Sequence, residues 1–190
     1  MTADTDGAVL DTAARELLLS RIRDIADWPE PGVMFKDITP LLHDHTAFAT
    51  VISALAAVGR DESGVRRVDT VVGIEARGFI LAAPVAHVLG AGMVPVRKAG
   101  KLPYKTRSAR YSLEYGEATV EVHRDAFEPG DRVLVVDDVL ATGGTVAATA
   151  GLVREAGAEV VAVAVLMELG FLAGRDRLAG QVDLHALLSV

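Results

Sequence analysis

Apolar residues gather into short uninterrupted runs from residue 70 onward. Four of these runs show no alternation with polar residues, which is typical of strands that are covered on both faces. They lie at residues 70–74, 93–96, 132–136 and 160–167. Helices are expected after the first run, ending near Gly90, and after the third, ending at Gly157. Strands that alternate with helices predict an α/β fold with a central parallel sheet flanked by helices.

The N-terminal part of the chain follows a different pattern. Residues 12–27 place apolar side chains on one face of a predicted helix, so an N-terminal helical segment is expected over residues 1–27. The prolines that follow end this helix. A second helix is expected to follow the polar residues 43–46 and to end near Val58. Residues 118–123 alternate between apolar and polar, which indicates a half-exposed antiparallel strand.

Composition indicates that these elements form one domain. The chain has 190 residues, 51% of them hydrophobic, and no repeat or linker divides it, so a single domain over residues 1–190 is expected. Cysteine is absent, which fits a reducing cytosol. The longest apolar runs fall short of the roughly 20 residues of a membrane-spanning helix, and the acidic N-terminus differs from a secretory signal. We therefore expect a soluble, cytoplasmic protein with no membrane partner.

One segment contrasts with the acidic charge of the whole chain. The formal net charge is −7, which argues against general nucleic-acid binding. Residues 97–116, however, hold six basic residues, a single acid (Glu114), three of the four lysines and all three tyrosines. The second part of this segment lacks apolar periodicity and is long for a simple connection, so a flexible active-site loop is expected over residues 97–116. A protein- or RNA-binding patch is the alternative.

The sequence VLVVDDVLATGGT at residues 133–145 carries the strongest chemical signal. Asp137 and Asp138 follow an apolar strand, and an expected loop over residues 137–144 leads into a helix. Ligands bind at the carboxyl ends of strands in open parallel sheets. The free backbone N–H groups, the hydroxyls and the positive end of the helix dipole predict a phosphate cradle. Its residues are Ala141, Thr142, Gly143, Gly144 and Thr145.

The two carboxylates need a different part of the ligand. Charge repulsion keeps Asp137 and Asp138 away from a phosphate, whereas the hydroxyls of a ribose diol can donate hydrogen bonds to them. The alternative is an acidic turn in which an aspartate caps the next helix. His43 and His45 resemble a metal-binding pair, but polar residues before a helix are more often caps.

This pattern resembles the phosphoribosyl-pyrophosphate (PRPP) signature of the type I phosphoribosyltransferases. Four further motifs resemble the adenine phosphoribosyltransferases within that family: PGVMFKDITPLL (31–42), GIEARGF (73–79), VPVRKAGKLP (94–103) and YSLEYG (111–116). The match runs in order from about Trp28 to the last strand. It implies the type I fold, a central parallel sheet with a small hood and a flexible catalytic loop. The implied activity is purine salvage, in which adenine and PRPP give AMP and pyrophosphate.

The resemblance also implies how PRPP is held. The 5-phosphate would lie on the cradle at residues 141–145, and the ribose hydroxyls on Asp137 and Asp138, of which Asp138 is also expected to be catalytic. The cations implied for the pyrophosphate group are Arg77, Arg97, Lys98 and Lys101. The Glu75–Ala76 region corresponds to the pyrophosphate loop, where the family can hold a non-proline cis peptide.

The base would bind on the other side of the site. The residues implied for adenine are Val33, Met34, Phe35, Lys36 and Leu169. Lys36 departs from the arginine that the family often has at this position, so the role of its charge is open. Glu114 corresponds to the glutamate proposed in the family to accept or hold the proton that adenine loses.

The remaining expectations concern cofactor, partner and alternatives. Mg²⁺ is the implied cofactor, held mainly by PRPP, pyrophosphate and water rather than by a protein metal site, and the family implies a homodimer. One alternative is the same reaction with another purine base. The other is a non-catalytic PRPP-sensing regulator, which usually adds a nucleic-acid-binding module that this chain has no spare length to form.

Overall fold

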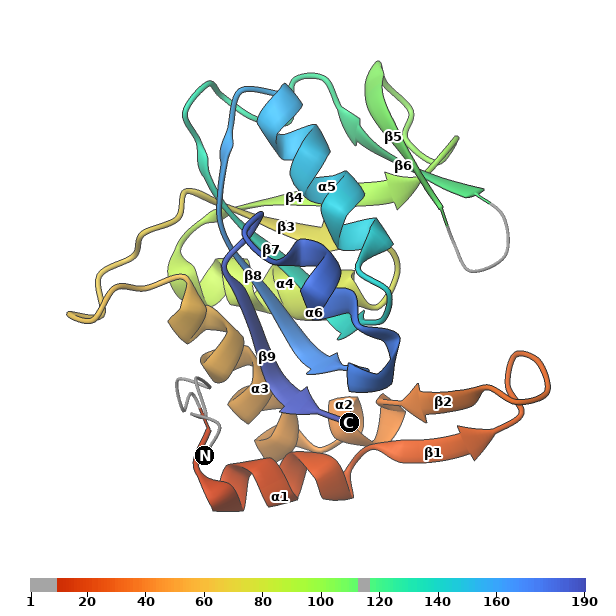
Figure 1. Ribbon diagram of the computed structural model, residues 1–190. Coiled ribbons are helices and arrows are strands. Elements are labelled where there is room, and N and C mark those ends of the chain that lie inside the picture. The colour runs from red at the N-terminus through yellow and green to blue at the C-terminus, as the bar shows by residue number, and fades with distance from the viewer. Residues whose placement is uncertain (1–9, 113–116) are drawn as a thin grey trace.

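The computed structural model describes residues 10–112 and 117–190, and its centre is a seven-stranded sheet with the order β5-β6-β4-β3-β7-β8-β9 (Figure 1). Strands β4, β3, β7, β8 and β9 run parallel, whereas β6 pairs antiparallel with β4 and β5. The bounds are β3 (Thr70–Ile74), β4 (Gly92–Lys98), β5 (Thr106–Ser112), β6 (Glu117–His123), β7 (Arg132–Leu140), β8 (Glu159–Glu168) and β9 (Leu184–Ser189). The predicted parallel strands and the half-exposed antiparallel strand are thus confirmed.

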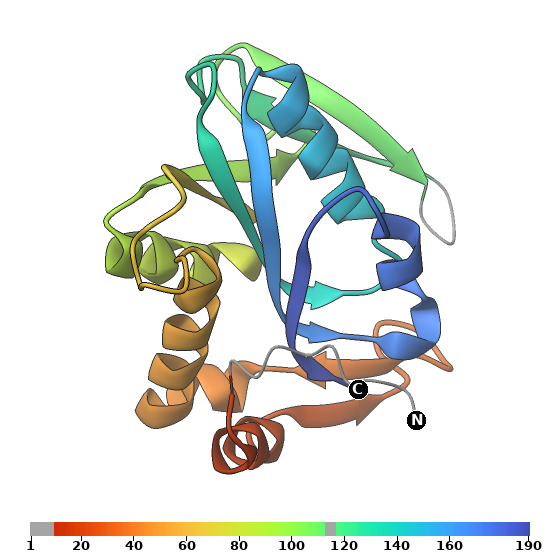
Figure 2. The ribbon, with the colours of Figure 1, turned by 60° about the vertical axis from the view of Figure 1, so that its left-hand side comes forward.

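Helices cover both faces of the sheet (Figures 1 and 2). Helices α3 (His45–Val58) and α4 (Gly78–Leu89) pack on one face, where Leu134 and Val136 of β7 join their core. Helix α5 (Gly144–Glu155) packs on the other face against Val133 and Val135. Because successive side chains of β7 enter different cores, both sets are apolar and the strand shows no polar alternation.

The N-terminal helix is shorter than predicted. Helix α1 (Thr12–Ser20) ends at Ser20, and residues 23–26 form strand β1 (Arg23–Ala26) instead of continuing the helix to residue 27. Strand β1 pairs antiparallel with β2 (Met34–Asp37), so Ile25 faces Phe35 across the pair. The spacing of the apolar residues near residue 25 suits one face of a helix and also a strand of a hairpin. Pairing with β2 makes residues 23–26 a strand. This hairpin lies next to the carboxyl ends of β8 and β9 in both ribbon views.

The segment 97–116 is also more regular than predicted. Its start belongs to β4, and β5 pairs residue by residue with β6, from Thr106 opposite His123 to Ser112 opposite Glu117. The expectation of a loop is therefore wrong for residues 106–112, where Ala109 and Tyr111 pack against the core beneath α5. Residues 113–116 lie outside the described residues, and the flexibility of the segment stays a prediction.

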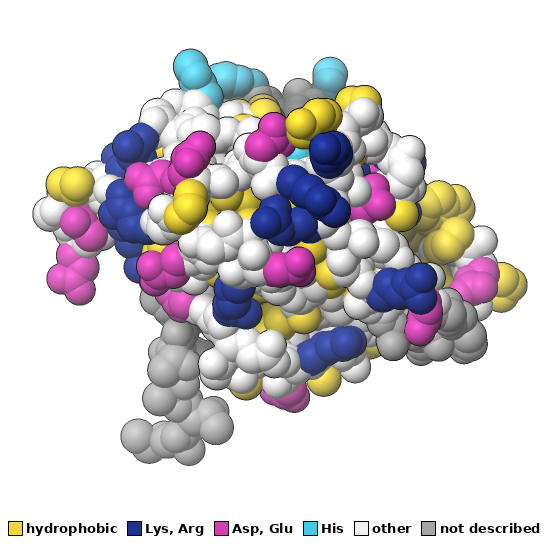
Figure 3. Space-filling model, turned by 90° about the horizontal axis from the view of Figure 1, so that it is seen from above, with side chains coloured by type: hydrophobic (Ala, Val, Ile, Leu, Met, Phe, Trp, Pro, Cys, Tyr) yellow, Lys and Arg dark blue, Asp and Glu magenta, His cyan; other side chains and the backbone are white. Residues whose placement is uncertain are grey.

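Three short helices complete the fold. These are α2 (Thr39–His43), the 3₁₀ turn η1 (Gly170–Leu172) and α6 (Gly174–Leu178). Across residues 10–112 and 117–190, no helix is both long and apolar enough to cross a membrane. Basic side chains are interspersed with acidic ones on the face seen from above in Figure 3, so the basic residues visible there do not merge into a continuous patch.

Packing at the central strand predicts a large loss of stability on truncation. Leu134→Ala removes a side chain that is fully buried in β7 and should lower the free energy of unfolding by about 2–5 kcal/mol. Leu19→Ala, at a half-exposed position of α1, should change it by less than about 0.5 kcal/mol. Urea denaturation followed by circular dichroism measures both, and a similar small effect for the two variants would contradict the packing described here.

Candidate active site

Two buried carboxylates mark the end of the central strand. Asp137 and Asp138 are 9% and 6% exposed, and both belong to β7, which pairs with β8 as far as Leu140. The loop predicted over residues 137–144 is therefore wrong for 137–140, because the ladder with β8 continues through these residues. The Asp138 N–H donates to Asp137 Oδ1 at 2.9 Å. The N-cap of α5 is Gly143, with no side-chain hydrogen bond, so neither aspartate caps this helix.

Burial dominates the protonation of this pair. It raises the pKa of Asp137 well above the ordinary value, and the nearby charge of Asp138 raises it further. Burial also raises the pKa of Asp138, although the Arg77 guanidinium opposes that rise. Asp138 Oδ2 lies 2.6 Å from Arg77 Nη2. The site thus holds two carboxyl groups with raised pKa values, one of them paired with a cation.

The phosphate cradle follows directly after these carboxylates. Asp137 lines the same cavity of about 130 Å³ as the predicted cradle residues 141–145. The backbone at Gly143 has φ +77°, in the region that favours glycine, and α5 begins at the next residue. Free N–H groups at the start of this helix of 12 residues suit an anion. The structure therefore brings together the carboxylates and the small-residue turn.

A second glycine supports the cradle from the side. A Cβ atom added to Gly174, at the start of α6, would collide with the Ala141 carbonyl oxygen, and a Cβ on Gly143 would lie 2.8 Å from the Gly174 carbonyl oxygen. The turn at 141–143 and the start of α6 are thus in direct backbone contact. Gly174 was not among the predicted site residues, and the small-residue pair Ala173-Gly174 was the available signal in the sequence.

The residues predicted to bind pyrophosphate at the end of β4 contact Glu75, whose region was expected to form the pyrophosphate loop but whose role as their partner was not predicted. Glu75 Oε2 accepts hydrogen bonds from Arg97 Nε at 3.3 Å and from the Lys98 N–H at 3.0 Å, while Lys101 Nζ pairs with Oε1. Burial raises the pKa of Glu75, but the bonds from Lys101 and Lys98 outweigh it and hold this pKa below the ordinary value. The Glu75–Ala76 peptide bond is cis, as the resemblance suggested.

Arg77 connects the sheet with the β1–β2 hairpin. Besides the contact with Asp138, its Nη1 donates to the Lys36 carbonyl oxygen at 3.1 Å, and its guanidinium lies 4.9 Å from the centre of the Phe35 ring. Trp28 packs edge-on against the same ring at 4.3 Å. Arg77, Asp138 and two of the predicted base-site residues therefore form one contiguous group.

The other predicted base-site residues have different surroundings. Val33 and Met34 are exposed on the hairpin, and the Leu169 N–H donates to the Leu140 carbonyl oxygen beside the cradle. Lys36 Nζ lies 2.8 Å from Asp24 Oδ1 across the β1–β2 hairpin, which we call the hood, so the charge of Lys36 is paired within this hairpin. Glu114 lies outside the described residues, and its catalytic role stays a prediction.

The histidines at 43 and 45 flank a helix cap. Asp44 Oδ1 accepts hydrogen bonds from the backbone N–H groups of Thr46 and Ala47 at 3.0 and 3.1 Å, which confirms the expected cap. Over residues 10–112 and 117–190, no group of three or more His, Cys, Asp or Glu side chains could hold a metal ion.

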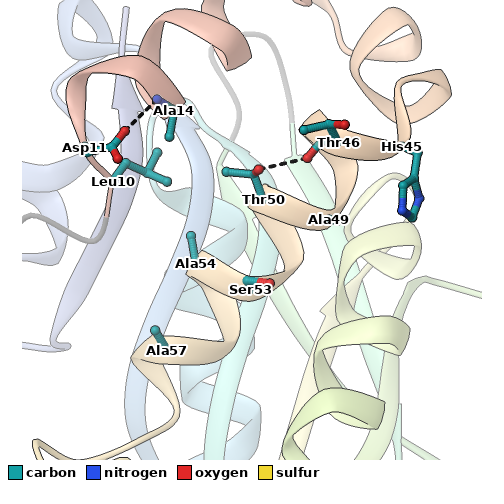
Figure 4. Close-up of a pocket in the computed structure, with 10 residues that line it drawn as sticks. All are labelled: Leu10, Asp11, Ala14, His45, Thr46, Ala49, Thr50, Ser53, Ala54 and Ala57. Atoms are coloured by element: carbon teal, nitrogen blue, oxygen red, sulfur yellow. Dashed lines mark hydrogen bonds between the residues drawn. The ribbon is translucent and has the colours of Figure 1, made fainter.

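A wider hollow between α1 and α3 offers less chemistry. It has a volume of about 570 Å³ and is lined mainly by small residues (Figure 4). Asp11 Oδ1 already accepts from the Ala14 N–H, and the Thr50 hydroxyl already donates to the Thr46 carbonyl oxygen. The cavity at β7 combines the buried Asp137 with the free N–H groups at the start of α5, so it is the better candidate site.

The fold and this site together define a phosphoribosyl transferase domain. Residues 41–184 match the family model of that description. The match contains β3, β7, the cradle and the cations at the end of β4.

Comparison with curated relatives narrows the assignment. The adenine phosphoribosyltransferase of Nocardioides sp. is 64% identical over 172 residues, which are 90% of this chain and 92% of the relative. That of Streptomyces coelicolor is 62% identical, with 94% of this chain and 98% of the relative covered. The chain belongs to the adenine phosphoribosyltransferase family.

Solved structures agree with the predicted type I fold. The adenine phosphoribosyltransferase of Rhodothermus marinus superposes with a TM-score of 0.89 at 51% identity, covering 95% of this chain and 100% of that one. The Saccharomyces cerevisiae protein gives a TM-score of 0.87 at 34% identity over 94% of this chain and 100% of that one. It was solved with D-2,5-dideoxy-2,5-imino-altritol 1,6-bisphosphate and adenine.

The raised pKa of Asp137 predicts a stabilising substitution. A raised carboxyl pKa means that the stability linked to its proton is fully present below the ordinary value of 3.8 and is lost as the pH rises through the folded value. Asn cannot lose a proton, so Asp137→Asn should raise the free energy of unfolding of the ligand-free protein at pH 8, by about 1–3 kcal/mol.

The pH dependence separates this effect from a general change in packing. Urea denaturation at pH 5 and pH 8 should show the larger gain at pH 8. Asp125→Asn, at an exposed loop position, is the control and should show no comparable gain. A gain for Asp137→Asn that is equal at the two pH values would contradict the buried titration.

Proposed function

We propose that the chain transfers the 5-phosphoribosyl group from PRPP to adenine, giving AMP and pyrophosphate in purine salvage. The observation that carries this proposal is the cavity that residues 141–145 share with Asp137 at the end of β7. A phosphate on the cradle and hydroxyls on the carboxylates are the two features of a ribose 5-phosphate. The S. cerevisiae relative, solved with a bisphosphate and adenine, supports the same assignment.

The ribose would be held by two carboxyl groups that differ in their partners. Asp138, paired with Arg77, would accept a hydrogen bond from a ribose hydroxyl. Burial raises the pKa of Asp137 well above its ordinary value in the ligand-free protein. Hydroxyl donors would then favour the ionised form, so ligand binding would offset part of the burial cost.

The leaving group requires positive charge. Negative charge grows on the pyrophosphate as its bond to C1 loosens, and positioned cations stabilise that charge. Arg77, Arg97, Lys98 and Lys101 would serve this purpose, Arg by paired hydrogen bonds and Lys as a compact charge.

Mg²⁺ would assist the same step by neutralising pyrophosphate oxygens. Asp137 lines the cavity, and the adjacent Asp138 is already paired with Arg77. This donor set fits an ion that is held mainly by phosphate oxygens and water, as is usual for Mg²⁺.

The base would lie between the hood and the sheet. Phe35 offers an aromatic face and Leu169 an apolar one, which suits a purine. The pairing of Lys36 with Asp24 leaves its backbone and alkyl chain, rather than its charge, for the base. Glu114 would accept the proton that adenine loses, and we propose a homodimer in the cytoplasm as the working state.

Direct assay tests the proposed reaction. The protein is incubated with PRPP, Mg²⁺ and each purine base in turn, and nucleotide and pyrophosphate are measured. AMP and pyrophosphate should form in equal amounts with adenine. Product formed only with hypoxanthine or guanine would show that another purine base is the substrate. PRPP binding without any product would favour a PRPP-sensing regulator.

Substitution at Gly174 tests the cradle. Gly174→Ala should push the Ala141 carbonyl out of place and weaken PRPP binding roughly tenfold or more, because small displacements of a binding turn are costly. Gly151→Ala, where an added Cβ meets nothing within 4 Å, is the matched control and should bind normally. Calorimetric titration with PRPP measures both, and equal affinities would contradict the assignment.

Substitution at Glu114 tests the proton acceptor. Glu114→Gln should lower the turnover number by about 10²–10⁴-fold, the usual contribution of a general base, while PRPP affinity stays within a few fold. Glu117→Gln, the same change at the exposed start of β6, should retain turnover. Unchanged turnover in Glu114→Gln would remove this residue from the mechanism.

A further inference from the structure

A single buried carboxylate organises the cationic turn that follows β4. The Glu75 side chain is only 7% exposed, and its two oxygens bind three donors from residues 97–101. Its backbone N–H also donates to the Val96 carbonyl oxygen at 2.9 Å. The turn after β3 is therefore joined to the end of β4 through both backbone and side chain.

The three donors are held to different degrees. Arg97 is fixed at two points, because its Nε bonds Glu75 and its Nη1 donates to the Lys101 carbonyl oxygen at 3.0 Å. The Lys98 backbone N–H is bound to the same Glu75 oxygen as Arg97. Lys101 reaches Glu75 from the solvent side, with 48% of its side chain exposed. Arg97 is thus anchored, whereas Lys101 can turn toward an arriving anion.

The charge balance of this cluster favours an anionic ligand. Arg97, Lys98 and Lys101 carry three positive charges, and Glu75 offsets one of them. Without Glu75, the long cationic side chains would repel one another and sample many rotamers, and immobilising each side chain would cost conformational entropy. An anchoring carboxylate reduces this cost before the ligand binds.

We propose that Glu75 is a positioning residue that holds Arg97 and the 97–101 turn in place for the pyrophosphate group, and that shares Lys101 with this group once it is bound. This inference rests on the proposed function and adds the residue that positions the cations. Glu75 itself need not touch the substrate.

Comparison of two ligands of the same site tests this role. Inorganic pyrophosphate with Mg²⁺ uses the cation cluster, whereas AMP uses the cradle, the carboxylates and the base pocket. Glu75→Gln should weaken pyrophosphate binding roughly 10- to 100-fold, since charge-assisted bonds to the cations are lost, and should change AMP binding less than threefold. In the assay with PRPP, KM should rise more than the turnover number falls.

A matched variant controls for damage to the turn. Glu121 Oε2 accepts the Gly100 N–H of the same turn at 3.0 Å. The side-chain oxygen of a glutamine can still accept this N–H, so Glu121→Gln should change pyrophosphate binding less than threefold. Glu75→Asp keeps the charge but shortens the reach, and it should also weaken pyrophosphate binding selectively. This variant tests the proposal if Glu75→Gln does not fold.

The two possible roles of Glu75 predict opposite changes in pyrophosphate affinity. If Glu75 only neutralises the cations, its removal should tighten pyrophosphate binding, and tighter or unchanged binding in Glu75→Gln would overturn the proposal. Equal losses of AMP and pyrophosphate binding would also overturn it, since they indicate general damage. Failure of the proposed function looks different, because the wild-type protein would then bind pyrophosphate without forming AMP from adenine and PRPP.

Discussion

The burial of two adjacent carboxylates at the end of an apolar strand is the constraint on which the site depends. Asp137 and Asp138 lie in β7, whose preceding residues are fully buried between two hydrophobic cores. Charge is costly there, and burial raises the pKa of both groups. Arg77 partly compensates Asp138, while Asp137 accepts the backbone N–H of Asp138. In the proposed reaction, ribose hydroxyls would donate hydrogen bonds to these two groups.

Arg77 extends this constraint to the rest of the molecule. Its guanidinium contacts the carboxylate of β7, the backbone of β2 and the ring of Phe35, so it joins the sheet to the hood. Glu75, two residues earlier, joins the same turn to the end of β4. Two charged residues of one short turn thus connect β7, the β1–β2 hairpin and the end of β4, which carry the proposed phosphate and base sites. Affinity for a ligand that spans both sides would follow from this preorganisation.

Particular elements show how far sequence alone could go. The runs at 70–74 and 132–136 could only be strands of a covered sheet, because they are apolar without alternation and too short for core helices. The small-residue turn at 141–145 was predictable from its glycines and the helix that follows, whereas its binding of a phosphate stays a prediction. Strand β5 was missed because TRSARYS carries no clear apolar face and pairs with a strand that comes later in the chain. The hairpin at residue 23 was missed because its apolar spacing also suits a helix.

The sequence by itself determined the α/β class, the parallel strands of the central sheet with the helices between them, and the residue types of a proposed phosphate and pyrophosphate site. Local periodicity and turn chemistry suffice for these, since they act over a few neighbouring residues. Only the tertiary structure decided which partners the charged groups have: Arg77 with Asp138, Lys36 with Asp24, and Arg97 and Lys101 with Glu75. These pairs join residues that are 12 or more positions apart in the chain. Such contacts depend on how the sheet and the hood pack together, which no local pattern encodes.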